Sequence, residues 1–99
     1  MRKSLFSGQT ANATSPWFRP GAGTYTVHAH GGLGSGTLKI LLSADGVTAS
    51  AADAAMTFTA TPAPFQITLT DGDFVAADLS GATAATLTVD ITGNGPEKD

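Results

Sequence analysis

The chain has 99 residues and no cysteine, so its length suits one small domain and its composition excludes disulfide bonds and thiolate zinc sites. Its formal net charge is −3 at pH 7, and the scatter of its five basic residues argues against an electrostatic nucleic-acid binder. No stretch approaches the roughly 18 apolar residues of a membrane span, and the first residues lack the apolar core of a signal peptide. We therefore expect a protein that stays in the cytoplasm where it is made, or is assembled there into something larger, and contacts neither nucleic acid nor membrane.

Charged residues make up 13% of the chain, which is about half of their usual share in a soluble domain. This low share suggests that much of the surface meets other protein, the alternative being that Thr and Ser side chains solvate it. Small domains without crosslinks are also often marginal alone, which favours oligomerisation or docking onto a larger assembly.

The N-terminal residues 1–16 are polar and show no regular alternation. We expect them to form an arm that becomes ordered on a partner, although residues 4–6 could instead add a strand. The folded domain is then expected to span residues 17–93, followed by a flexible tail at residues 94–99.

Trp17 and Phe18, beside Arg19, form the one aromatic cluster of the sequence. If exposed, the cluster could stack on a sugar ring or anchor a protein partner, because Trp and Arg are frequent hot-spot residues. If buried, Trp17 would fill a core that is otherwise short of large side chains, and we favour burial.

From residue 24 onward, apolar and polar residues alternate in segments bounded by Gly, Pro and Asp, which is typical of half-buried strands. Tyr25, Val27 and Ala29 fall on one face of the first segment, and His28 and His30 fall on the other. Further strands are expected at residues 37–43, 55–60, 65–70, 74–79 and 87–92, with a shorter segment around residues 17–18.

His28 and His30 resemble half of a metal site, because residues two apart on a strand project to the same side. A site needs a further ligand, however, and the sequence holds no third histidine and places its carboxylates mostly in turns or on polar faces. We expect no metal and no other cofactor. We interpret the pair as solvent-facing or as part of a protein contact, where histidines would make assembly sensitive to mildly acidic pH.

The glycine-rich residues 31–36 fail both nucleotide-binding templates, because Thr37 stands where a dinucleotide fingerprint needs glycine and a P-loop needs lysine. We expect a flexible connection between two strands. Residues 45–55 are the best place for a helical turn, capped by Ser50 or Asp53, with a loop as the alternative.

Signals for catalysis are equally weak. The chain has neither cysteine nor a Gly-x-Ser-x-Gly elbow, and Asp71 and Asp73 fit a tight turn better than a calcium site. We therefore expect no enzyme. Seven to eight short strands, with turn signals roughly every 8–12 residues, predict an all-β fold: a single antiparallel β-sandwich, jelly-roll-like.

Residues 35–46 read SGTLKILLSADG, a strand that runs into a Ser-x-Asp-Gly turn. Residues 65–93 read FQITLTDGDFVAADLSGATAATLTVDITG: a strand, a short acidic turn, an edge strand, Ser-Gly-Ala-Thr and a final strand. Both stretches resemble small β-sandwich virion proteins of tailed bacteriophages, which decorate heads or belong to tails and fibres. The chain departs from that family at residues 47–49, where members often carry a tryptophan. The resemblance implies a structural virion protein and supplies no catalytic residues.

Our first hypothesis is thus a capsid decoration (cement) protein of the virion that stabilises the head by binding across major capsid protein subunits. We expect it to act as a homo-oligomer, preferably a trimer, with other virion proteins as the remaining partners. The alternative is a carbohydrate- or receptor-binding module of a tail or fibre. The candidate partner contacts are Trp17, Phe18, Arg19, Tyr25, His28 and His30.

Overall fold

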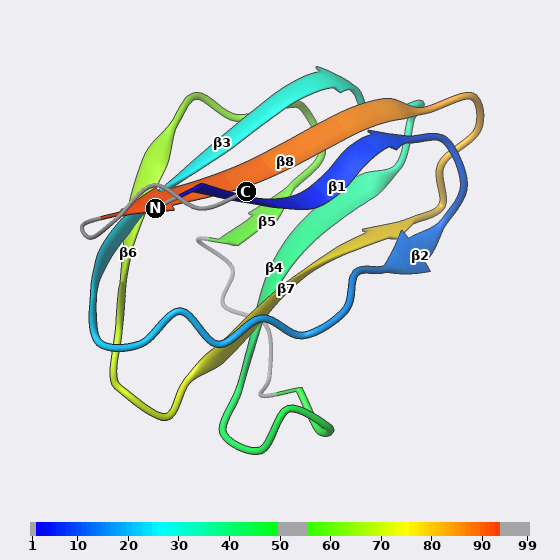
Figure 1. Cartoon of the computed structure of the whole chain (residues 1–99). Helices are drawn as coiled ribbons and strands as arrows, with labels where there is room; N and C mark the ends of the chain where they lie inside the picture. Colours follow the sequence, from blue (N-terminus) through cyan, green and yellow to red (C-terminus); the bar gives the residue numbers. More distant parts are fainter. Residues whose placement is uncertain (1, 50–55, 94–99) are drawn as a thin grey trace.

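The computed structural model describes residues 2–49 and 56–93, whose regular elements are all β-strands (Figure 1). The strands are β1 (Arg2–Gln9), β2 (Ala13–Thr14), β3 (Gly23–Gly32), β4 (Thr37–Ser43), β5 (Thr57–Phe58), β6 (Phe65–Leu69), β7 (Phe74–Ser80) and β8 (Thr86–Gly93). No helix of the described residues is long and apolar enough to cross a membrane.

The strands form two four-stranded antiparallel sheets that pack face to face. Sheet A has the order β1-β8-β3-β6 and sheet B the order β2-β7-β4-β5. β1 pairs with β8, β2 with β7, β3 with β6 and β4 with β5, as in a long hairpin that bends between β4 and β5 and is then rolled up. This arrangement is the jelly roll, so the predicted fold class is confirmed.

The core lies between the sheets and follows the period-2 pattern of the strands. In β8, for example, Leu87, Val89 and Ile91 are completely buried, while the residues between them face outward. Leu38 and Ile40 of β4 meet them from sheet B and are also completely buried. The alternation read from the sequence therefore identifies the inward faces of β4 and β8.

The N-terminal residues correct one expectation. Arg2–Gln9 is not an irregular arm but edge strand β1, which pairs with β8 and buries Leu5 and Phe6. The pairing register shifts between Ser4 and Phe6 and again before Gln9. These irregularities place two neighbouring side chains in the core and interrupt the alternation, which is why the strand does not show in the sequence pattern.

The glycine-rich connection between β3 and β4 is a tight turn. A hydrogen bond from the Gly36 N–H to the Leu33 carbonyl closes it at 3.0 Å, and the Thr83 N–H donates to the Gly34 carbonyl. In the described part of residues 45–55, residues 45–48 are bends and Ala49 forms a bridge with Ser43. The expected caps at Ser50 and Asp53, and the expected tail at residues 94–99, lie outside the described residues.

Candidate functional site

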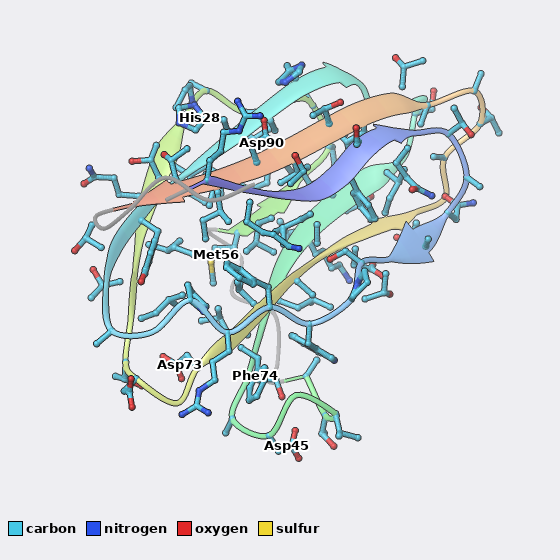
Figure 2. All side chains as sticks on the ribbon, in the orientation of Figure 1. His28, Asp45, Met56, Asp73, Phe74 and Asp90 are labelled. Atoms are coloured by element: carbon cyan, nitrogen blue, oxygen red, sulfur yellow. The ribbon has the colours of Figure 1, made fainter. Side chains whose placement is uncertain are left out.

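His28 and His30 lie on the outer face of sheet A, as the alternation predicts. His28 is half-buried and stands directly across from Asp90 of β8, while His30 is exposed across from Thr88. Figure 2 places His28 and Asp90 near each other at the top of the view, away from sheet B. The His28 Nε2 atom lies 3.3 Å from the hydroxyl of Thr92. We call this polar surface of β8 and β3 the histidine face.

Asp90 also has a partner on its other side. The hydroxyl of Ser4 in β1 donates to the Asp90 carboxylate at 2.6 Å, so Ser4, Asp90 and His28 form a row across three strands. In a serine nucleophile the histidine stands between serine and carboxylate, whereas here the carboxylate stands in the middle. The Ser4–Asp90 hydrogen bond therefore links β1 to β8, and the order of the three side chains does not activate the serine.

The histidine face does not gather a metal-binding set. Within residues 2–49 and 56–93, no group of three or more His, Cys, Asp or Glu side chains is placed to hold one ion. His28 and Asp90 thus offer polar groups for hydrogen bonds, which suits contact with a protein surface.

Tyr25 leaves the set of candidate contacts. Its side chain is 4% exposed and lies in the core, and the single proton of its hydroxyl is shared between the carbonyls of Pro20 and Gly21, which lie 3.1 and 2.9 Å away. A tyrosine that reaches back to the backbone just before its own strand locks the entry of the chain into the sheet. Its inclusion among the partner contacts is corrected, since its role is internal.

The two aromatic residues of the cluster are half-buried, whereas the neighbouring Arg19 is exposed. Trp17 and Phe18 are both half-buried, and Phe18 exchanges backbone hydrogen bonds with Val75 along the edge of β7. Arg19 is exposed: its Nε donates to the Asp71 carbonyl at 3.0 Å, and its guanidinium lies 5.8 Å from the centre of the Phe74 ring. The guanidinium also lies 3.9 Å from the Asp71 carboxylate. Arg19 therefore clamps the turn between β6 and β7.

The candidate contacts do not form one site. Figure 2 labels Phe74, which Arg19 covers, near the bottom of the view and His28 near the top. The structure thus separates the histidine face on sheet A from the segment of residues 17–19, which runs along β7 of sheet B. A partner that touches both would have to span the sandwich.

An apolar hollow that the sequence reading missed opens beside strand β6. It has a volume of about 470 Å³ and is lined mainly by Leu42, Met56, Phe58, Phe65 and Ile67. Two of these lining residues, Phe58 and Phe65, have their ring centres 5.1 Å apart. We call this hollow the edge groove, because β5 and β6 are neighbouring edges of the two sheets. Pro62 and Pro64, which precede β6, were the available signal for an edge strand.

The turn after β4 presents a second exposed apolar group. Val47 is 81% exposed at its tip, while the Asp45 carboxylate accepts hydrogen bonds from the backbone N–H groups of Val47 and Thr48, both at 2.8 Å. These two bonds, and a third from the Ser43 hydroxyl, lower the pKa of Asp45 below its ordinary value because they stabilise the charged form. The turn is therefore held by its own side chains.

No protein-family model, no curated protein and no solved structure gives a significant match to this chain. Its function has to be argued from its own residues, their geometry and the resemblance of residues 35–46 and 65–93.

Proposed function

We propose that the chain is a structural protein of a tailed-phage virion, which decorates the head by binding across neighbouring major capsid protein subunits. The supporting observation is the place of the two resembling segments in the fold. Residues 35–46 supply β4 and its turn, and residues 65–93 supply β6, β7 and β8. These strands make up two of the four in each sheet, so the resemblance extends through the sandwich and is not limited to one hairpin.

The proposed mechanism needs no chemistry at a site. A protein that binds only the assembled shell lowers the free energy of that shell relative to free subunits, and so stabilises it by mass action. A small chain with 13% charged residues can bury much of its surface against such a shell at a low cost of desolvation. The jelly roll itself is shared by viral capsid domains and by lectins, so the fold alone does not choose between these functions.

The carbohydrate-binding alternative has lost part of its basis. It relied on Trp17, Tyr25 and the histidine face as the contact surface, and Tyr25 lies in the core while Trp17 is half-buried. Carbohydrate binding is therefore kept only as one possible outcome of the experiment described next.

The test is sedimentation with shells assembled from the major capsid protein of the same genome. We expect the chain to travel with assembled shells, to stay behind when mixed with unassembled subunits, and to raise the temperature at which the shells burst. An unrelated β-sandwich protein of similar size is the control for trapping. A chain that stays at the top of the gradient with both preparations would overturn the proposal, and its retention on a glycan column would then support the carbohydrate-binding alternative.

A further inference from the structure

Strand β6 is the least protected edge of the two sheets. An open sheet edge offers free N–H and C=O groups to another chain. Folded proteins protect their edges against such pairing with short strands, charges or bulges. β2 and β5 have only two residues each, and β1 carries Arg2, Lys3 and two register shifts. β6 has five uncharged residues paired with β3 in unbroken register, and no described strand pairs with its other side. In Figure 1 it runs along the left margin of the molecule.

The apolar–polar pattern of β6, though not its sequence, is the same when it is reversed. Phe65-Gln66-Ile67-Thr68-Leu69 alternates apolar and polar residues symmetrically about Ile67. Antiparallel pairing with a second β6 would set Phe65 against Leu69, Gln66 against Thr68 and Ile67 against itself. Apolar groups then meet on the inner side and polar groups on the outer side, which is the register that sheet packing rewards.

We propose that two copies of the chain pair through β6, so that the two A sheets form one eight-stranded sheet around a two-fold axis at Ile67. Charges do not oppose this arrangement. In the same register Asp71 faces Ala63 of the second copy, not another carboxylate, and Asp71 already lies near Arg19. Pro64 lacks an N–H and limits the pairing to the five residues of β6.

The edge groove is the second reason for choosing this occupant. A five-residue strand pair buries too little surface for a stable dimer, which usually needs at least about 1,200 Å² in total. The groove lies along the same edge and is lined by β6 residues together with Leu42, Met56 and Phe58. Across the two-fold axis the apolar linings of the two copies face each other, so pairing removes both from water.

The symmetry makes the proposal specific. A strand that pairs with its own copy forms an isologous contact, which closes at two chains. The trimer expected from the sequence cannot form through this edge alone. The dimer also needs no capsid protein, so its test uses the purified chain and is independent of the proposed function.

The test places like charges opposite each other on the exposed side of β6. Gln66 and Thr68 are both exposed, so lysines there do not disturb the core. In a Gln66→Lys/Thr68→Lys variant every lysine faces a lysine of the second copy, which destabilises the pairing. We expect sedimentation equilibrium to show a concentration-dependent dimer for the natural chain and a monomer for this variant.

A charge exchange then tests the register. In a Gln66→Lys/Thr68→Glu variant each lysine faces a glutamate, so the dimer should return. An Ala11→Lys/Ala44→Lys variant adds the same two charges at exposed positions away from β6, and it should still form the dimer. A natural chain that stays monomeric at millimolar concentration would overturn the proposal. So would an oligomer that the lysine pair leaves intact, or a charge exchange that restores nothing while circular dichroism shows a folded protein.

Discussion

Tyr25 joins the start of β3 to the segment before it. Its ring packs beside Gly93, where a Cβ atom would come within 2.2 Å of the ring carbon Cδ1, and its hydroxyl reaches two carbonyls outside the strand. The side chain thus closes the sheet at the point where β3 and β8 meet, because Tyr25 and Gly93 are paired.

A Tyr25→Phe variant keeps the ring and removes only the hydroxyl. We expect the free energy of unfolding in urea to fall by about 1 kcal/mol, since the Pro20 and Gly21 carbonyls lose the one hydroxyl proton that they share. Thr10→Val, which alters an exposed hydroxyl outside the strands, is the matched control and should change stability little. A Tyr25→Phe variant as stable as the natural chain would mean that water replaces the hydroxyl at no cost.

Asp45 makes the turn after β4 sensitive to acid. Backbone N–H groups of Thr48 and Val47, followed by the Ser43 hydroxyl, lower the pKa of Asp45 below its ordinary value. A carboxyl whose pKa is lower in the folded state stabilises that state above its unfolded pKa, and this contribution is lost as the pH falls through the folded value. NMR titration should therefore give a pKa below 3.8 for Asp45 and show the Val47 and Thr48 amide signals moving with it. An Asp45→Asn variant should remove that movement, and an ordinary pKa for Asp45 would contradict the hydrogen bonds described above.

The turn between β3 and β4 is built on glycines that leave no room for a side chain. Gly31 has a φ of +94°, and a Cβ atom there would lie 1.7 Å from the carbonyl oxygen of Thr86. A Gly31→Ala variant should lose about 2–4 kcal/mol of stability, because it adds both a steric clash and an unfavourable backbone conformation. Gly72→Ala is the control, since nothing lies within 4 Å of its Cβ position and its φ is not positive. Thermal unfolding of the two variants measures the difference, and equal midpoints would show that the β3 backbone can move away from Thr86.

Phe6 tests whether the N-terminal residues form strand β1 or the arm that orders only on a partner. Phe6 is 4% exposed, so a Phe6→Ala variant should lose about 3–5 kcal/mol as it leaves a cavity in the core. Val47→Ala, at an 81% exposed position, should stay within about 0.5 kcal/mol of the natural chain. If Phe6→Ala does not fold, the smaller change Phe6→Leu allows the urea measurement. Full stability of both Phe6 variants would restore the arm that orders only on a partner.

The elements show what a sequence pattern can and cannot reveal. β6 and β8 are predictable because every second residue is apolar, and β6 is followed by the turn residues Asp71–Asp73. β1 is not predictable, since its register shifts put Leu5 and Phe6 side by side in the core. The histidine face follows from the same alternation. The edge groove does not, because it depends on which strands end each sheet, and strand order is a property of the tertiary fold.

At the scale of the whole molecule, the sandwich has two surfaces with different chemistry. The histidine face is polar and rich in threonine, whereas the edge groove is apolar and lies at the side of the sheets. Under the proposed function, the chain needs one surface for its own copies and one for the shell. If β6 serves the copies, the histidine face remains free in the dimer, because side chains of an extended sheet still point away from its plane.

Under the proposed function, this division predicts which surface meets the shell. His28 and His30 lie on the outer face of sheet A, where His28 stands across from Asp90. A His28→Ala/His30→Ala variant should fold as the natural chain does, since both residues lie on the outer face. It should bind shells about tenfold more weakly than the natural chain, because it removes two side chains from the proposed contact.

The measurement is the fraction of chain that sediments with shells, with Val47→Ala at an exposed position in the turn after β4 as the control. β6 dimerisation should be the same in all three chains, because β6 pairs with residues 23–27 of β3 and not with His28, His30 or Val47. A double histidine variant that unfolds would show that the face carries part of the core. One that binds shells as the natural chain does would place the shell contact on another surface, with residues 17–19 along β7 as the next to test.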